Sequence, residues 1–239
     1  MNAQPCLIEP GVTLGADCNL APFAVVKTGS VLGDRVTVDH FAVVGGLPQD
    51  LKFDPATKSG VRIGAGTVLR EGVTIHRATT EGGFTEIGAN CLLMVNSHVG
   101  HDCTLGDSVI MANGALLGGH VHVGKNAFIS GNAVIHQHVR VGEGCMISGG
   151  SRVGLDVPPF VIVDGKNTVG GLNLVGLRRR GHTAEEITDL KNCYRAIYMS
   201  TVKGSAADKA ATVTPTTETG KTFIDFFAAR GRGFIHARR

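Results

Sequence analysis

Aliphatic residues followed by glycine recur along this chain with a fixed period. The pairs Ile87-Gly88, Leu105-Gly106, Val123-Gly124 and Val141-Gly142 lie 18 residues apart, one from the next, and Leu14-Gly15, Leu32-Gly33 and Val153-Gly154 are weaker examples. A fixed period indicates one structural unit used repeatedly. Eighteen residues make three runs of six, which predicts a triangular parallel β-helix. Its aliphatic residues should point inward, and its glycines should lie at corners where a Cβ is unfavourable.

Two polar segments interrupt this repeat. Residues 46–60 break its phase and contain two prolines, which cannot continue a ladder of paired strands. Residues 76–85 form a second polar segment that contains Glu81-Gly82-Gly83. Long loops in compact domains are often functional, so the first interruption is a candidate for contacts with a substrate.

The pattern becomes helical after Pro158-Pro159. Thr183 and Glu186 have the spacing of a capping box, and apolar residues then recur at helical spacing, which predicts an amphipathic helix over 183–200. A loop is expected over 203–221 and one more short helix over 223–230. The chain is therefore predicted to be mainly β, with a β-helix domain over 1–165 and a C-terminal α-helical region over 166–239.

Composition agrees with a solenoid rather than an aromatic-rich core. The 239 residues include 34 glycines, two tyrosines and no tryptophan, and the net charge is only +3, which does not indicate nucleic-acid binding. The six cysteines show no C-x-x-C spacing, as expected for a reduced cytoplasmic protein. No secretion signal and no membrane span are predicted. Exposed coil faces usually need covering, so we expect an oligomer.

Histidines supply the candidate chemistry. His101 precedes Asp102 near a predicted corner, where both side chains can face outward, and an imidazole oriented by a carboxylate is the usual general base at neutral pH. Gly119 and His120 follow about one coil later, and the backbone N–H groups exposed there could hold a developing oxyanion. Imidazoles on neighbouring coils, His98 and His122 among them, could instead bind zinc.

Other polar residues are weaker candidates when taken alone. His136-Gln137 lies one further coil along the chain, and Asp50 and Lys52 in the first interruption could bond sugar hydroxyls. Arg178-Arg179-Arg180 is a compact cationic cluster of the kind that binds phosphate. Taken alone, Asp50 and Lys52 are more typical of solvated loop charges, and the three arginines are more typical of a basic surface turn.

An ordered set of motifs resembles one family over almost the whole chain. That family is the acyl-carrier-protein-dependent UDP-N-acetylglucosamine O-acyltransferases, which start lipid A biosynthesis. The matching segments include Gln49-Asp50-Leu51-Lys52-Phe53, Thr74-Ile75-His76-Arg77, His98 with His101-Asp102-Cys103, Gly119-His120-Val121, His136-Gln137, Asp156-Val157-Pro158-Pro159, Leu177-Arg178-Arg179-Arg180-Gly181 and Asp225-Phe226-Phe227.

The resemblance implies a left-handed β-helix, a homotrimer with active sites between subunits, and no cofactor or metal. It implies that His101 is the general base for the sugar 3-hydroxyl, that Asp102 orients it, and that the Gly119 N–H stabilises the oxyanion without a covalent acyl-enzyme. The substrate-contacting positions that it implies are Asp50, Lys52, His98, His120, His136 and Gln137, with Asn173, Arg179 and Arg180 on the nucleotide. Gly149 matches the acyl-length position, and a glycine there leaves room for a long chain.

Two departures from the family accompany these matches. Val175 stands where the family carries Glu, and the C-terminal region is shorter and rich in Thr and Ala. A basic surface formed by Lys191, Arg195, Arg230, Arg232, Arg238 and Arg239 is expected to bind the acidic acyl carrier protein. Three alternatives stay open: acylation of a 3-amino sugar nucleotide, a γ-carbonic-anhydrase-like metal enzyme, and a β-helix without catalytic activity.

Overall fold

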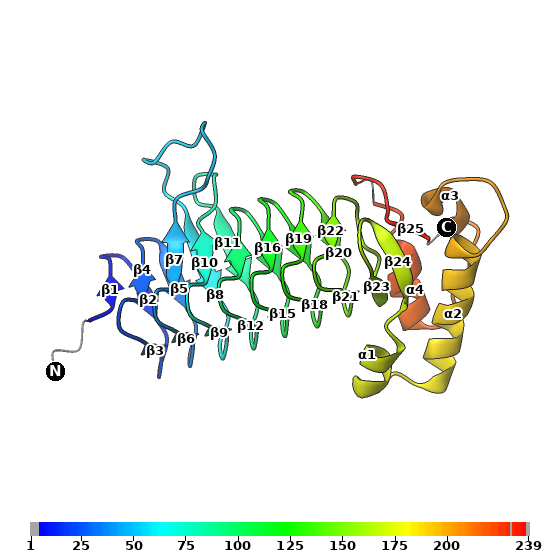
Figure 1. Cartoon of the computed structure of the whole chain (residues 1–239), viewed down its shortest axis with the longest axis horizontal. Coiled ribbons are helices and arrows are strands. Elements are labelled where there is room, and N and C mark those ends of the chain that lie inside the picture. The colour runs from blue at the N-terminus through cyan, green and yellow to red at the C-terminus, as the bar shows by residue number, and fades with distance from the viewer. Residues whose placement is uncertain (1–4, 230, 238–239) are drawn as a thin grey trace.

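The chain forms an elongated triangular prism with helices at its C-terminal end (Figure 1). We describe residues 5–229 and 231–237 of a computed structural model. Three sheets, here called A, B and C, form the sides of the prism. Each coil contributes one short strand to each sheet in turn, and every pairing within the coils is parallel. The predicted parallel β-helix is therefore confirmed.

The strands of the three sheets are listed here in spatial order. Sheet A contains β1 (Leu7–Ile8), β4 (Val25–Val26), β7 (Val43–Gly46), β10 (Thr74–His76), β13 (His98–Val99), β16 (Leu116–Leu117), β19 (Val134–Ile135) and β22 (Arg152–Val153). Sheet B contains β2 (Thr13–Leu14), β5 (Ser30–Leu32), β8 (Gly60–Ile63), β11 (Phe84–Ile87), β14 (Thr104–Leu105), β17 (His122–Val123) and β20 (Arg140–Val141). Sheet C contains β3 (Asn19–Leu20), β6 (Thr37–Val38), β9 (Val68–Leu69), β12 (Leu92–Leu93), β15 (Ile110–Met111), β18 (Phe128–Ile129), β21 (Met146–Ile147), β23 (Val161–Val163), β24 (Thr168–Leu172) and β25 (His236–Ala237).

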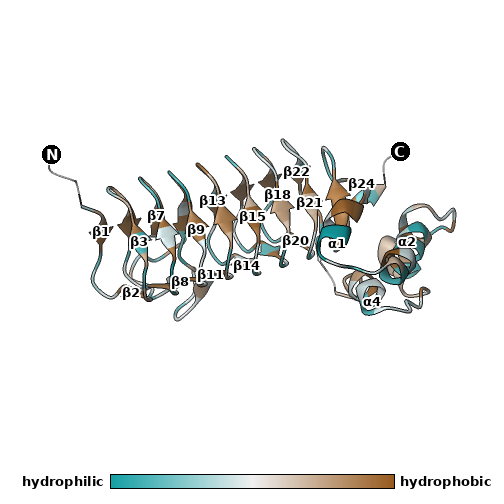
Figure 2. Cartoon of the chain, turned by 90° about the horizontal axis from the view of Figure 1, so that it is seen from below, coloured by the Kyte–Doolittle hydropathy of each residue, from teal (hydrophilic) through white to brown (hydrophobic). Residues whose placement is uncertain are grey.

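The repeat of aliphatic residues and glycines builds the core of the prism. The aliphatic member of each pair points inward, so that Leu105, Val123 and Val141 are at most 3% exposed and stack in sheet B. Figure 2 shows the strands as predominantly hydrophobic along the whole prism. The following glycine is needed because the next coil is close: a Cβ at Gly106 would lie 2.6 Å from the backbone nitrogen of Lys125.

The corners of the prism are tight turns with one left-handed residue each. At the corner between sheets A and B, here called corner AB, three successive coils place Asp102, His120 and His138 at φ angles of 58°, 58° and 62°. Asp and His tolerate this conformation better than most residues. Because these positions are equivalent, their side chains project from the same edge in register.

The two predicted interruptions are loops beside corner AB. Residues 47–59 connect β7 to β8, and residues 77–83 connect β10 to β11, and both project from the same side of the prism (Figure 1). Arg77 joins them, because its guanidinium donates to the carbonyl oxygens of Thr57 and Pro55 at 3.0 and 2.8 Å and lies 5.2 Å from the centre of the Phe53 ring. The longer loop is thus held against the coil that follows it.

The C-terminal region contains α1 (Leu174–Arg179), α2 (Ala184–Tyr198), α3 (Ala206–Ala210) and α4 (Glu218–Asp225). The capping box that Thr183 and Glu186 predicted is present at the start of α2. The loop predicted over 203–221 is wrong, because Ser205 and Thr217 cap α3 and α4 within it. The helix predicted over 223–230 begins earlier and ends at Asp225, and Arg230 lies outside the described residues.

A buried ion pair ties the C-terminal segment to the last coils. Asp156 is fully buried and accepts hydrogen bonds from the backbone and guanidinium of Arg140, with an Nη2–Oδ2 distance of 2.7 Å. The backbone of Asp156 also pairs with Gly233 and Ile235. The six cysteines are all free, and no helix within the described residues is long and apolar enough to cross a membrane.

Candidate active site

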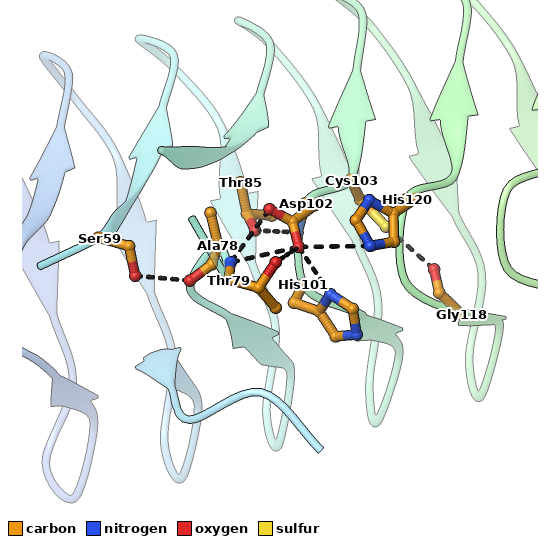
Figure 3. A network of polar contacts seen from close by, with 9 residues as sticks. All are labelled: Ser59, Ala78, Thr79, Thr85, His101, Asp102, Cys103, Gly118 and His120. Carbon is orange, nitrogen blue, oxygen red and sulfur yellow. Dashed lines mark hydrogen bonds and ion pairs between the residues drawn. The ribbon is translucent and has the colours of Figure 1, made fainter. Parts of the chain in front are cut away.

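His101 and Asp102 form a hydrogen-bonded pair at corner AB, as the sequence predicted. The turn between β13 and β14 directs both side chains outward, and His101 Nδ1 lies 2.7 Å from Asp102 Oδ2 (Figure 3). This contact selects the tautomer with a proton on Nδ1, which leaves Nε2 as the basic nitrogen. The two side chains are 15% and 14% exposed, so the pair is largely buried but still reaches the surface. We call it the dyad.

Asp102 is held in the charged form by several donors. Burial raises the pKa of this carboxyl, but hydrogen bonds from His101 and from the hydroxyl and backbone of Thr79 lower it, and the net pKa lies below its usual range. The backbone N–H of Asp102 donates to Thr85 Oγ1 at 2.8 Å. The carboxylate is therefore ionised at neutral pH and can stabilise a proton on His101.

Gly119 lies directly under the His101 ring. The two residues are 18 apart and so occupy equivalent positions on successive coils, and a Cβ at position 119 would lie 2.5 Å from His101 Cε1. Only glycine leaves space there for the ring and for a reacting group beside it. Among the described residues, no hydrogen bond uses the Gly119 N–H. This donor is available to a ligand.

His120 and His138 extend the row of imidazoles along corner AB. The His120 ring is perpendicular to that of His101 at a centroid distance of 5.0 Å and stacks on His138 at 4.6 Å. His138 was not among the predicted site residues, although its position 18 residues after His120 places it on the same corner. His136 and Gln137 lie in the same turn and are exposed. Corner AB thus brings together most of the predicted histidines.

His98 lies in sheet A beside His76, a histidine for which the sequence predicted no role. His98 Nδ1 is 2.7 Å from Thr74 Oγ1, and its ring contacts that of His76 edge-on at 4.7 Å. Burial lowers the pKa of His98, and the nearby His101 lowers it further. Burial, with smaller contributions from His98 and His101, lowers the pKa of His76 to about 4. Both imidazoles are neutral at pH 7.

The buried His76 is expected to make stability depend on pH. The unfolded chain binds a proton at this residue below about pH 6.5, whereas the folded chain does so only near pH 4. Stability is therefore lost as the pH falls through this window, by roughly 3 kcal/mol for this group. Chemical denaturation of the wild type and His76→Asn from pH 7.5 to 4 measures the effect. As the pH falls, the unfolding free energy of the wild type should drop by about 3 kcal/mol more than that of His76→Asn. Parallel curves would contradict the assignment.

The remaining predicted residues form no hydrogen bond or ion pair with the dyad among the described residues, and several of them lie at other corners of the prism. Asn173 and Arg180 lie at the corner between sheets B and C, where Asn173 Nδ2 donates to the carbonyl of Gly144 at 3.0 Å. Asn173 Oδ1 also caps α1 by accepting from Gly176 N, so its amide is used within the chain. Arg179, at the end of α1, is exposed, as are Asp50 and Lys52 in the loop 47–59. Gly149 lies at the third corner, between sheets C and A.

Only one group of side chains in the described part of the chain has the spacing of a metal site. It consists of His101, Asp102 and His120, whose ligand atoms lie within 4.8 Å of one another. His98 and His122 are not part of it, because His98 lies in sheet A and His122 in sheet B. The three-histidine arrangement weighed in the sequence analysis is therefore not formed by these residues. Two imidazoles and a carboxylate fit zinc as well as they fit proton transfer.

Family models match most of the chain. A model described as Udp N-acetylglucosamine O-acyltransferase, domain 2, matches residues 156–235. A model of bacterial transferase hexapeptide repeats matches residues 84–119 and 120–154. The second match spans the coils that carry the dyad and Gly119.

Several solved structures are similar over nearly the full length. A UDP-N-acetylglucosamine acyltransferase from Campylobacter jejuni has a TM-score of 0.87 and 33% identity, covering 100% of this chain and 99% of that one. One from Bacteroides fragilis has a TM-score of 0.88 and 35% identity over 96% and 98%. One from Arabidopsis has a TM-score of 0.83 and 32% identity over 97% and 92%. These similarities confirm the left-handed β-helix with a C-terminal helical region.

Proposed function

Since the chain belongs to the UDP-N-acetylglucosamine O-acyltransferase family, we propose that it transfers an acyl group from acyl carrier protein to the 3-hydroxyl of UDP-N-acetylglucosamine, the first step of lipid A biosynthesis. The observation that carries this proposal is the dyad above Gly119. One nitrogen of His101 is bound by Asp102. In the part of the chain that the structure describes, the other nitrogen has no hydrogen-bond partner and lies beside Gly119, whose N–H is likewise unused.

The reaction that fits this geometry needs no covalent intermediate. His101 Nε2 takes the proton of the sugar hydroxyl as its oxygen attacks the thioester carbon of the donor. The Gly119 N–H bonds the carbonyl oxygen as it becomes negatively charged. The C–S bond then breaks, the proton moves from His101 to the thiolate, and the ester and the free thiol of the carrier leave. Asp102 stabilises the protonated imidazole throughout, and the buried Cys103 takes no part because burial raises its pKa to about 12.

We propose a homotrimer because the dyad and the proposed nucleotide-binding residues lie at different corners of the same chain. The dyad lies at corner AB, whereas Asn173, Arg179 and Arg180 belong to the opposite region around corner BC and α1. A neighbouring copy would supply the nucleotide-binding residues to the dyad of the first. Leu51, in the loop 47–59, is fully exposed, and packing against a neighbour would cover it.

The finer assignments stay proposals that rest on the same family membership. His98, His120, His136, Gln137, Asp50 and Lys52 would contact the sugar and the donor, and Gly149 would leave room for a long acyl chain. Lys191, Arg195 and Arg232 would contribute to a carrier-protein surface, whereas Arg230, Arg238 and Arg239 lie outside the described residues. A cytoplasmic location also stays a prediction. The domain boundary at 165/166 stays a prediction too. β24, which follows this boundary, pairs with β23, which precedes it.

A transfer assay with mass-spectrometric detection tests the proposed activity. The purified protein, treated with chelator, is incubated with a 3-hydroxyacyl-acyl carrier protein and UDP-N-acetylglucosamine. We expect an O-acylated sugar nucleotide and no loss of rate after chelation. Matched reactions replace the donor by the corresponding acyl-CoA, and the acceptor by its 3-amino analogue. Faster reaction with the amine would reassign the acceptor, and a rate that depends on added zinc would favour the metal site.

A further inference from the structure

Two imidazoles converge on the same oxygen of Asp102. His101 Nδ1 lies 2.7 Å from Oδ2, and His120 Nε2 lies 3.6 Å from the same atom. His120 occupies the turn position that is equivalent to Asp102 on the next coil, so the carboxylate has two imidazoles within reach. A further contact must therefore determine which of the two histidines is paired with the carboxylate.

Thr79 holds the carboxylate from the side opposite these imidazoles (Figure 3). Its hydroxyl donates to Oδ2 at 2.7 Å, and its backbone N–H donates to Oδ1 and Oδ2 at 3.0 and 3.2 Å. Two donors from one residue, one of them shared between both oxygens, oppose rotation of the carboxylate about its Cβ–Cγ bond. Hydrogen bonds to an ionised acceptor are stronger than those between neutral groups.

Thr79 is itself fixed by the longer loop. The buried Ser59, at the end of residues 47–59, donates its hydroxyl to the carbonyl of Ala78 at 2.5 Å. The backbone N–H of Ala78 bonds the carbonyl of Gly60 at 3.3 Å. Ala78, which precedes Thr79, is thus anchored through both its N–H and its carbonyl group to residues 59 and 60, at the start of β8. These bonds also fix the position of Thr79.

We propose that Thr79 is a positioning residue that keeps Asp102 paired with His101 rather than with His120. The inference rests on the proposed function, because it names the residue that determines which imidazole is the base. Thr79 itself touches no reacting atom. Its effect passes through Asp102 to the tautomer and orientation of the His101 ring.

Thr79→Val is the sharpest test because valine keeps the β-branched shape and the backbone N–H but loses the hydroxyl. We expect kcat/KM to fall about 10- to 100-fold, the loss typical of a hydrogen bond to a charged group. The acidic limb of the pH profile should move to lower pH, since a base that is paired with the carboxylate for less of the time holds its proton less strongly. Thr79→Ser restores the hydroxyl and should recover most of the activity.

Two controls separate positioning from a general disturbance of the loop. Thr80→Val makes the same change at the next, exposed residue and should leave the rate and the pH profile unchanged. In a His101→Ala background, Thr79→Val should cost almost nothing further, because its target is already absent. An additive loss, or a lowered rate with an unmoved pH profile, would overturn the proposal.

A measurement without substrate keeps this inference distinguishable from the proposed function. ¹⁵N NMR of histidine-labelled protein, with His101→Ala to assign the signal, reports which ring nitrogen of His101 carries the proton. We expect the Nδ1-protonated form in the wild type and a mixture of tautomers in Thr79→Val. The same spectrum in both proteins would refute the role of Thr79 even if transferase activity is present. A changed spectrum in a chain that transfers no acyl group would refute the proposed function alone.

Discussion

Replacing His101 by alanine is expected to lower kcat for acyl transfer by about 10²–10⁴-fold, the contribution typical of a positioned general base. The KM for the sugar nucleotide should change little, because the lost interaction acts on the proton of the hydroxyl in the transition state. The ring lies at an external corner of the prism, so the fold should persist. Steady-state kinetics with the carrier-protein donor measure the effect, and thermal unfolding checks the fold.

The neighbouring residues give a graded comparison for this variant. Asp102→Asn should be severely impaired as well, since an amide stabilises an imidazolium less than a carboxylate does and permits the wrong tautomer. His120→Ala should cost less than His101→Ala, because His120 lies 3.6 Å from Asp102 and lacks the short contact. The opposite ranking, with His120 the more costly, would transfer the role of base to His120.

Mixing two inactive variants is expected to restore activity. His101→Ala removes the base, and Arg179→Ala/Arg180→Ala removes the cationic residues near corner BC. Each variant by itself should therefore be nearly inactive in the proposed homotrimer. In each mixed trimer of the two chains, about one third of the sites combine an intact base with intact arginines from the neighbouring subunit. Co-expression with two different affinity tags and tandem purification yields the mixed trimers for assay.

The outcome of this mixing decides whether the site is shared. Restored activity near the expected fraction requires that the two sets of residues come from different chains. Mixed trimers no more active than the better parent would mean that one chain supplies both sets or that the arginines do not contribute. Size-exclusion chromatography of each parent serves as the control, because a variant that fails to assemble would also give no rescue.

The local sequence pattern was sufficient to predict the repeated part of the fold, because every coil carries the same pattern. Each aliphatic-glycine pair states both that a side chain is buried and that the next backbone is close, and the positions of Leu105 and Gly106 confirm both statements. The C-terminal region lacked such redundancy. There α3 and α4 depend on the caps Ser205 and Thr217 and on contacts such as the bond from Thr217 Oγ1 to Asp189, which joins residues 28 positions apart.

The site shows the same division between local and distant information. The sequence by itself predicted the coils, because they follow from an 18-residue repeat. It also predicted that His101 and Asp102 face outward at a corner and that Gly119 and His120 lie about one coil further on. Only the tertiary structure decided that Thr79 donates hydrogen bonds to the Asp102 carboxylate and that His76 is buried beside His98. It also decided that the arginines at the end of α1 lie at a different corner from the dyad. These contacts depend on the conformations of loops and of the C-terminal region, which the 18-residue repeat does not predict. Hydrogen bonds between residues far apart in the sequence form only once those segments are folded.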